Sequence, residues 1–454
     1  MGGEWMPRRT PMRPGGLLAV WFFSRAASLR NLQPQDPFSA YDGHDLLQVT
    51  ACNASALGEL RQALDSASCR VLTEPGELVL PREVGCAAAQ VTCPPEARLR
   101  GHGIELLVEG AAGEAMRRRG AMHLTMPMDH DSQTSLRRQP LPTGSTFYEH
   151  FRDYDDIQAH LRNLVNASNG VAKLVELMPF TVHGRRILTV RLVGKRWKPG
   201  APRLIFSYTL HAREWISAMA GVYAVEEALA DAAANPEAYA ELSITFVPVS
   251  NPDGFVYSAT SDRFWRKNRA RYSGGTGVDL NRNFKFQWAQ HVTGPGLVPD
   301  VFPGPFPASE RETQALQHLT EEAPLSVHLD FHSCGGFILG PWAYTLHDHP
   351  RRKEIVELGS AMQKAIFSHE GSTYEFCTGN SCLYPVSGAF SDFSTAVGGL
   401  GFTVEMRPLV GRFASYADFI PAPSTILPNA KENYNAVQAA IRWAVKAHGG
   451  RARP

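Results

Sequence analysis

The sequence lacks an uninterrupted apolar run of about 18 residues or more, the length that a helix needs to cross a bilayer. It also lacks an excess of charge, because 45 basic residues nearly cancel 44 acidic ones and leave a formal charge of +1. Binding to a polyanion without sequence preference requires a basic surplus. We therefore expect no membrane span and no nucleic-acid partner.

Cysteine pairs with the CxxC spacing of a structural zinc site are absent as well. Four cysteines instead fall early in the chain and three fall late: Cys52, Cys69, Cys86, Cys93, Cys334, Cys377 and Cys382. The four early ones suit two disulfides in a small secreted unit, with three connectivities open. Small buried thiols are the alternative.

The first 37 residues have the rough layout of a secretory signal. Arginines at positions 8, 9 and 13 precede the apolar run GLLAVWFF, and SRAAS follows it. Because Arg25 interrupts the region where small neutral residues precede a cleavage site, a start without a targeting role is the alternative. The Asn-x-Ser sites at Asn53 and Asn166 fit a secreted protein but are frequent by chance. We expect residues 1–37 to direct the chain to secretion, the secretory pathway or a vacuolar lumen.

Two further segments precede the main domain. Residues 38–116 have the pattern of a small α/β unit, with strands expected in YDGHDLLQV and GIELLVEG and a helix in SALGELRQALDS. Residues 117–146 mix arginine clusters with Met, Pro, Ser and Thr and have no sustained apolar period, which predicts an exposed linker. The basic clusters invite proteolysis, and a solvated charge run without a processing role is the alternative.

Residues 147–450 alternate short apolar runs with amphipathic segments, which predicts an α/β domain with helices flanking a sheet. The expected strands are ILTVRLVG, RLIFSYTL, SITFVPVS, PLSVHLDF and LGFTVEM. Helices are expected at 215–233, at 309–322 and in the last long segment, where apolar residues recur at steps of three and four: Tyr434, Val437, Ile441 and Val445. No internal repeat is present in the sequence.

HAREW, directly after an expected strand, places an imidazole and a carboxylate three residues apart. A catalytic zinc site uses three His or carboxylate ligands and keeps one position open, and two ligands commonly come from one short segment. His211 and Glu214 supply such a segment, and His332 in SVHLDFHSCGG is the third candidate. Glu405 ends the expected strand GFTVEM. Because all four follow carboxyl ends of strands, where crevices form in open α/β sheets, we expect them to converge.

The chain resembles the zinc metallocarboxypeptidases of the pancreatic carboxypeptidase A/B type. The resemblance rests on HAREW, NPDGFVYS, DRFWRKNRA, GVDLNRNFKFQW, LYPVSGAFSDF and FTVEMRP, and it extends to FYEHFRDYDDIQAHLRNLV and ILPNAKENYNAVQAAIRWAV. It implies a mixed, largely parallel central sheet flanked by helices in residues 147–450. It also implies that residues 38–116 are an inhibitory pro-domain and that residues 117–146 are a basic activation linker, cut by an activating protease.

By this resemblance, His211, Glu214 and His332 are the ligands of one Zn²⁺ ion in the catalytic domain. Glu405 becomes the general base, which takes a proton from the attacking water and later delivers it to the departing amine. Arg266 in FWRKN falls where the family places the guanidinium that stabilises the oxyanion.

The resemblance also assigns residues to substrate binding. Asn281 and Arg282 in DLNRN match the residues that clamp the free terminal carboxylate through parallel hydrogen bonds. Tyr384 matches the tyrosine that closes over the substrate. Three more arginines match positions that line the cleft, with ordinary surface arginines as the alternative: Arg213, Arg263 and Arg407.

Specificity depends most on Ser391, which the resemblance places at the base of the specificity pocket. In this family an acidic residue there accompanies removal of Lys or Arg, and an uncharged one accompanies removal of apolar residues. Leu339, Ala343 and Leu383 would line a mostly apolar wall, against which a lysine ammonium without a counter-charge is costly to bury. We therefore predict release of neutral, aliphatic or aromatic C-terminal residues. A shift of one position would put Asp392 at the base and invert this preference.

The chain departs from the pancreatic enzymes at Cys334, where those enzymes carry an aromatic residue. Cys377 and Cys382 either bridge each other across a tight loop, or one of them pairs with Cys334.

The expected function is a zinc-dependent exopeptidase that hydrolyses the C-terminal peptide bond of peptides and proteins and is made as a latent precursor. A zinc amidohydrolase acting on small acylated amino acids and an inactive peptidase-like binding protein are the alternatives. The arginine motif and the segment around Tyr384 argue against the first, and retention of all four metal-site groups argues against the second.

Overall fold

The computed structural model describes residues 45–51, 69–71, 87–93, 104–111, 144–290, 299–378, 381–407 and 416–451. The expected signal at 1–37, the helix expected in SALGELRQALDS and the linker up to residue 143 lie outside the described residues. Within the described ranges, no helix combines the length and the apolar character that crossing a bilayer requires.

The early described segments form a four-stranded sheet with the order β2-β3-β1-β4. Its strands are β1 (Asp45–Ala51), β2 (Arg70–Val71), β3 (Ala87–Cys93) and β4 (Ile104–Ala111). All neighbours in it are antiparallel. β1 and β4 overlap the two strands that the sequence predicts there, and Cys69, beside β2, is disulfide-bonded as one reading of the early cysteines expects.

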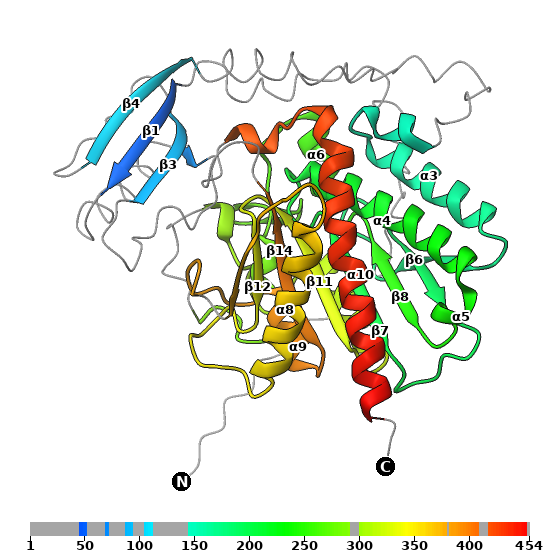
Figure 1. The fold of residues 1–454 in the computed structure, drawn as a ribbon. Helices are drawn as coiled ribbons and strands as arrows, with labels where there is room; N and C mark the ends of the chain where they lie inside the picture. The colour runs from blue at the N-terminus through cyan, green and yellow to red at the C-terminus, as the bar shows by residue number, and fades with distance from the viewer. Residues whose placement is uncertain are drawn as a thin grey trace, which may run out of the picture. The chain divides into compact units, whose positions relative to one another are not determined.

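An eight-stranded sheet with the order β13-β12-β14-β11-β7-β8-β6-β5 forms the centre of the main domain (Figure 1). Its strands are β5 (Ala172–Leu177), β6 (Ile187–Val193), β7 (Arg203–Tyr208), β8 (Ser243–Val247), β11 (Val327–Ser333), β12 (Phe337–Gly340), β13 (Glu375–Thr378) and β14 (Leu400–Met406). Four neighbouring pairs are parallel, namely β13–β12, β14–β11, β11–β7 and β7–β8, and three are antiparallel, namely β12–β14, β8–β6 and β6–β5. The sheet is therefore mixed and largely parallel, as expected, and a separate hairpin joins β9 (Arg271–Tyr272) to β10 (Gly275–Thr276).

Helices and short 3₁₀ turns connect these strands. The α-helices are α3 (Tyr154–Ala167), α4 (Trp215–Ala234), α5 (Pro236–Tyr239), α6 (Pro252–Thr260), α7 (Arg311–Glu321), α8 (Arg352–Phe367), α9 (Phe390–Ala396) and α10 (Ile426–Arg451). The 3₁₀ turns are η4 (Gly144–Glu149), η5 (Leu280–Arg282), η6 (Pro299–Val301), η7 (Tyr416–Phe419) and η8 (Pro423–Thr425). α4, α7 and α10 confirm the three helices expected from the apolar pattern.

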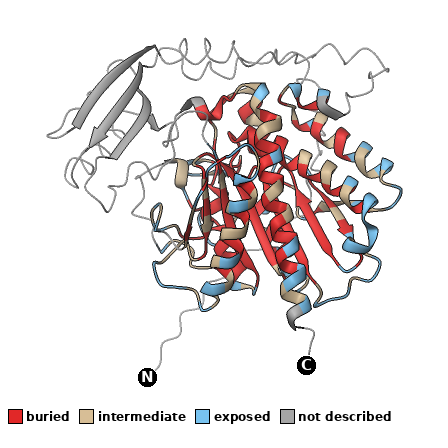
Figure 2. Cartoon of the chain, viewed as in Figure 1, coloured by how far each residue is buried: buried red, intermediate tan, exposed pale blue. Residues whose placement is uncertain are grey.

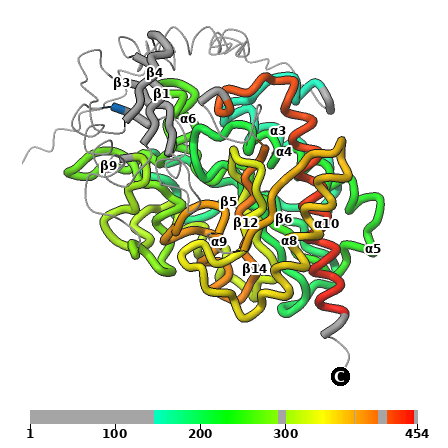
Figure 3. The backbone as a smooth tube through the Cα atoms, turned by 60° about the vertical axis from the view of Figure 1, so that its left-hand side comes forward, coloured from blue at the N-terminus to red at the C-terminus, as the bar shows by residue number. Residues whose placement is uncertain are grey.

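The helices cover both faces of the large sheet. α4, α8 and α10 pack on one face, where Phe206 of β7 and Phe331 of β11 join the larger core cluster (Figure 1). α8 and α10 lie side by side there, as the turned view in Figure 3 also shows. α7 and α9 pack on the opposite face, where Ile205 of β7 contacts a second cluster that includes Phe390 of α9. The central strands β7, β8, β11 and β14 are almost entirely buried between the two layers (Figure 2).

The side chains of β11 point alternately to the two helical layers that cover the sheet. Its odd-numbered residues Val327, Leu329 and Phe331 belong to the core beneath α4, α8 and α10. Because side chains alternate along a strand, the even-numbered ones point to the face covered by α7 and α9, which we call the α9 face. These are His328, Asp330 and His332. A polar row is thus buried on one side of a central strand, and it ends at the edge where the expected site lies.

Candidate metal centre

The expected metal ligands meet at the carboxyl ends of two neighbouring parallel strands. His211 and Glu214 follow β7, and His332 is the penultimate residue of β11. The donor atoms of the three side chains all lie within 4.8 Å of one another, and all three residues are buried. The convergence predicted from the ends of the strands is therefore present for these three of the four residues.

The three side chains face one another with their donor atoms. Nδ1 of His211 lies 2.7 Å from Oε1 of Glu214, and Nδ1 of His332 lies 3.1 Å from Oε2 of the same carboxylate. The two Nδ1 atoms are 3.0 Å apart. Burial opposes ionisation of Glu214, but the adjacent His211 and His332 lower its pKa below the ordinary value. The carboxylate therefore stays charged between the two rings.

A second carboxylate lies behind each imidazole. Nε2 of His211 is 3.2 Å from Oδ1 of Asp279, and Nε2 of His332 is 2.8 Å from Oδ2 of Asp330. An ionised carboxylate only accepts hydrogen bonds, so each Nε2 carries a proton and donates it. When each ring is neutral, the lone pair is then on Nδ1, directed at the shared cluster. Two imidazole nitrogens and a carboxylate are the donor set of catalytic zinc sites, and these residues fit that ion.

Asp279 connects this cluster to the arginines of the site. Besides His211, it accepts hydrogen bonds from Nε of Arg266 at 3.1 Å and from the backbone N–H of Asn281 at 2.9 Å. Nη1 of Arg282 lies 3.9 Å from its Oδ2 atom. Burial opposes the charge, but Arg266, Arg282 and His211 together lower the pKa of Asp279 well below its ordinary value. Asp279 was not among the residues expected from the sequence, although an acidic residue two positions before the Asn-Arg pair in GVDLNRN was an available signal.

Glu405 lies beside His332, one of the three expected metal ligands. The two residues are direct partners in the parallel register of β14 and β11. Glu405 is half-buried, whereas His332 is fully buried. The expected general base is therefore on the strand adjacent to the cluster.

Asn281 and Arg282 form part of η5, which Asp279 caps. Nη2 of Arg282 donates to the hydroxyl of Tyr384 at 3.3 Å, and Nη1 donates to the carbonyl of Asn281 at 2.9 Å. Oδ1 of Asn281 accepts a hydrogen bond from the backbone N–H of Phe390 at 2.9 Å. The structure thus brings together the two residues expected to bind a terminal carboxylate, the expected tyrosine and the first residue of α9.

Ser391 and its neighbour Asp392 lie in different environments. Ser391 is buried, and its Oγ atom accepts a hydrogen bond from Oγ1 of Thr403 at 3.1 Å, two residues before Glu405 on β14. The carboxylate of Asp392 accepts hydrogen bonds from the backbone N–H groups of Ala343, at 2.8 and 3.0 Å, and of Tyr344, at 3.1 Å. Burial raises the pKa of Asp392 to about 7, although these N–H groups oppose the rise. Asp392 is therefore engaged with the chain's own backbone.

The three residues expected to form the apolar wall of the pocket differ in how exposed they are. Leu339 on β12 and Ala343 are half-buried. Leu383 is 44% exposed. Leu383 therefore contributes to an apolar wall only in part.

Two of the three arginines expected to line the cleft are buried beneath aromatic rings. The guanidinium of Arg213 lies 4.3 Å from the ring centroid of Phe419, and that of Arg263 lies 3.7 Å from Trp215. Nη1 of Arg263 also donates to the carbonyl of Arg213 at 2.8 Å. Arg407, in contrast, is exposed, and its Nε atom lies 3.1 Å from Oε1 of Glu432. The guanidinium groups of Arg213 and Arg263 therefore pack against aromatic rings in the interior, in addition to any contact with substrate.

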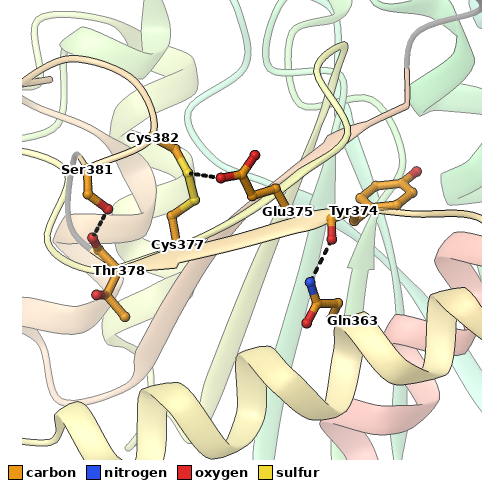
Figure 4. Close-up of a disulfide and its surroundings, with 7 residues drawn as sticks. All are labelled: Gln363, Tyr374, Glu375, Cys377, Thr378, Ser381 and Cys382. Atoms are coloured by element: carbon orange, nitrogen blue, oxygen red, sulfur yellow. Dashed lines mark hydrogen bonds between the residues drawn. A yellow bond between two sulfur atoms is a disulfide. The ribbon is translucent and has the colours of Figure 1, made fainter. Parts of the chain in front are cut away.

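Cys377 of β13 and Cys382 form a disulfide, which decides between the two pairings left open by the sequence (Figure 4). Cys334 lies outside this disulfide as a buried thiol. Ser381 donates a hydrogen bond to the carbonyl of Thr378 at 2.8 Å inside the same loop. Because Tyr384 follows Cys382 by two residues, the disulfide anchors the segment that carries it.

Comparison with known proteins gives concordant results. A family model described as "Zinc carboxypeptidase" matches residues 157–436. "Carboxypeptidase B" of Astacus astacus is 29% identical over 302 residues, which cover 64% of this chain and 96% of that protein. "Zinc carboxypeptidase A 1" of Drosophila melanogaster is 29% identical over 293 residues, covering 61% of this chain and 67% of that protein.

Among solved structures, carboxypeptidase A from Helicoverpa armigera superposes with a TM-score of 0.73. It is 23% identical and covers 90% of this chain and 98% of its own. At that level of identity the likeness shows that the fold is shared.

Proposed function

The chain belongs to the zinc carboxypeptidase family, and from that premise we propose that it hydrolyses the C-terminal peptide bond of peptides and proteins with one zinc ion bound by His211, Glu214 and His332. The observation that carries the proposal is the buried cluster of these three side chains, with a carboxylate behind each imidazole. When bound, zinc acts as a Lewis acid on the scissile carbonyl and lowers the pKa of water to about 7.

Glu405 is the general base and acid in this proposal. It takes a proton from the attacking water and delivers it to the nitrogen of the departing amino acid as the peptide bond breaks. Its position opposite His332 in the sheet register supports the role, because proton transfer requires the carboxylate to be within hydrogen-bond reach of the reacting water.

Arg266 stabilises the oxyanion that develops on the scissile carbonyl. Its link to Asp279, which also contacts His211, keeps the guanidinium in fixed relation to the metal ligands. Such a preorganised charge acts strongly because no reorganisation is needed as the reaction proceeds.

Arg282 and Asn281 bind the free carboxylate of the substrate, and Tyr384 closes beside them. A planar guanidinium binds a carboxylate through two parallel hydrogen bonds, which makes the reaction depend on a free C-terminus. The contact between Arg282 and Tyr384 supports a joint role for the two residues.

Metal analysis combined with an assay of amino acid release tests this function. The protein, cut in its linker, is expected to hold one zinc ion per chain and to release single residues from the C-terminus of an unmodified peptide. An amidohydrolase would act only on acylated amino acids, and an inactive binding protein would release nothing. Either result would contradict the proposal.

We propose a preference for neutral C-terminal residues, supported by the uncharged Ser391 and by the engagement of Asp392 with backbone N–H groups. Ser391→Asp is expected to raise kcat/KM for peptides ending in Lys or Arg by about 10–100-fold, because a charge-assisted hydrogen bond contributes about 1.5–3 kcal/mol. Peptides ending in Phe or Leu should be released more slowly.

The matched control for this prediction is Ser381→Asp, which adds the same charge to an exposed position of the disulfide loop. It should leave the preference of the wild-type chain unchanged. If the wild-type chain already releases Lys or Arg faster than Phe or Leu, the assignment of Ser391 to the pocket base is wrong.

We also propose that the chain is a latent precursor that enters the secretory pathway. The disulfide between Cys377 and Cys382 supports an oxidising compartment. Cleavage by an activating protease after Arg119 or Arg138 should raise activity several-fold, because it would separate residues 38–116, which we propose to be inhibitory, from the catalytic domain. Limited trypsin digestion followed by the peptide assay measures this.

The control for latency is a chain in which the five linker arginines at 117–119, 137 and 138 are replaced by glutamine. It should resist cutting in the linker and keep the low activity of the intact precursor. Equal activity before and after cleavage of the wild-type linker would leave residues 38–116 without an inhibitory role.

A further inference from the structure

A chain of hydrogen bonds runs through the buried α9 face of the sheet and ends at the metal ligand His332. Oγ of Ser394 on α9 lies 2.8 Å from Nδ1 of His328, and Nε2 of His328 lies 2.7 Å from Oγ of Ser207 on β7. Ser207 is 2.5 Å from Oδ1 of Asp330, whose Oδ2 atom is 2.8 Å from Nε2 of His332. All five residues are at most 1% exposed.

The direction of each hydrogen bond follows from the chemistry of Asp330. The ionised carboxylate only accepts, so Ser207 donates its hydroxyl proton to Oδ1. The oxygen of Ser207 then accepts from Nε2 of His328, which must carry the proton of that ring. Nδ1 of His328 is left as an acceptor, and the hydroxyl of Ser394 donates to it. Every donor on this side thus points toward Asp330, and His332 donates to it from the other side.

These hydrogen bonds determine which ring nitrogen of His332 faces the cluster of proposed metal ligands. With its proton held on Nε2 by Asp330, the ring directs Nδ1 at the cluster it shares with Glu214. Burial of so many polar groups is unfavourable unless all of them are paired, and in this chain each one has its partner. The paired polar row lies in a sheet whose other face is apolar, so the fold itself does not require it.

We propose that Asp330 is a positioning residue for the metal ligand His332, and that Ser207, His328 and Ser394 hold Asp330 in its accepting orientation. The proposal rests on the zinc-dependent function argued above. Because Ser394 follows Ser391 by three residues on α9, the same hydrogen bonds tie the helix of the specificity pocket to the metal ligand.

The carboxylate behind His211 is held differently. Asp279 is fixed by the charged Arg266 and by a backbone N–H, and it serves the arginines of the site as well as the ligand. On the side away from His332, Asp330 accepts from the neutral hydroxyl of Ser207, and no arginine pairs with it among the described residues. Its loss should therefore act through His332 and leave the binding of the substrate carboxylate intact.

Zinc affinity, measured by competition with a chromogenic chelator on the full chain, tests the proposal. Outer partners of metal ligands typically change metal affinity by about 10–100-fold, so Asp330→Asn is expected to raise the zinc Kd by that factor. Ser207→Ala should raise it less, and Ser394→Ala less again, in the order of their distance from His332 along the chain of bonds. At saturating zinc, kcat should fall while KM stays constant.

Two variants control for the loss of a buried polar group as such. Asp253→Asn removes a buried carboxylate that pairs with Arg185, and Ser372→Ala removes a buried hydroxyl that donates to Glu432. Both should lower the unfolding temperature of the metal-free chain and leave the zinc Kd unchanged. This separates positioning of the ligand from general stability.

If the wild-type chain binds zinc tightly and Asp330→Asn and Ser207→Ala bind it with the same Kd, the positioning role is wrong. The proposed function would be unaffected by that result. If Asp330→Asn does not fold, Ser207→Ala decides the same question, since it removes a single hydroxyl. An unchanged Kd in Ser394→Ala alone would contradict the link to α9. Absence of zinc binding in the wild type would instead overturn the proposed function itself.

Discussion

Replacing Glu405 with glutamine is expected to lower kcat for peptide hydrolysis by about 10²–10⁴-fold, the usual contribution of a general acid–base group. The amide has nearly the same shape but cannot accept the proton of the attacking water. Zinc content should remain that of the wild type, because Glu405 is not among the three side chains that form the donor cluster. Single-turnover kinetics and metal analysis of the purified variant measure both quantities.

The control is Glu237→Gln, the same substitution at an exposed residue of α5 that pairs with Arg196. It should change neither activity nor zinc content. Near-normal turnover in the Glu405 variant would remove this residue from the mechanism, and loss of zinc would move it into the set of ligands.

Asp279→Asn is expected to have the second large effect, because a single carboxylate serves His211, Arg266 and the backbone of Asn281. Removing one partner of a buried ion pair leaves an uncompensated charge and lowers the free energy of unfolding by about 3–5 kcal/mol. We expect the zinc Kd to rise by about 10–100-fold, and kcat/KM to fall at subsaturating zinc. Denaturant unfolding and chelator competition measure the two effects separately.

Asp348→Asn is the matched control for Asp279→Asn. Asp348 pairs with Arg352 on the surface, where such a pair contributes about 0.2–1 kcal/mol. Its loss should affect neither zinc nor turnover. If Asp279→Asn were as mild as this control, the link that we draw between the metal ligands and Arg266 would be wrong.

The positions of the proposed metal ligands could be predicted because they depend on local pattern. His211, His332 and Glu405 each follow or end an apolar run that reads as a strand, and parallel neighbours bring such ends together. The same reasoning would have found Asp330. The run VHLDFHS alternates apolar and polar residues, so a strand there must direct His328, Asp330 and His332 to one face.

Other features depend on partners that lie far away in the sequence. Arg213 was expected to line the cleft, with an ordinary surface arginine as the alternative, and its packing under Phe419 of η7, 206 positions later, could not be predicted from local pattern. The role of Asp279 follows from the way it caps η5 and reaches His211, which no spacing rule encodes. The choice between the two pairings of Cys377 likewise required the geometry of the loop after β13.

The helices also divide into those that local sequence pattern predicts and those that depend on tertiary contacts. α4 and α10 have long apolar patterns and were predicted, whereas α9 is only seven residues long and carries Ser391, Asp392 and Ser394 within it. A helix of that length is formed by tertiary packing, since isolated short helices are marginal in water. Phe390 and Phe393 provide this packing against the core of the α9 face.

The central claim is that this chain is a zinc enzyme that recognises a free C-terminus. The most direct measurement compares release of the last residue from two peptides of identical sequence ending in Phe, one with a free carboxylate and one amidated, before and after removal of zinc with a chelator. We predict release from the free acid alone, loss of that release when zinc is removed, and recovery when Zn²⁺ is added back. Equal release from the amidated peptide, or an unchanged rate in protein shown to be free of metal, would contradict the account.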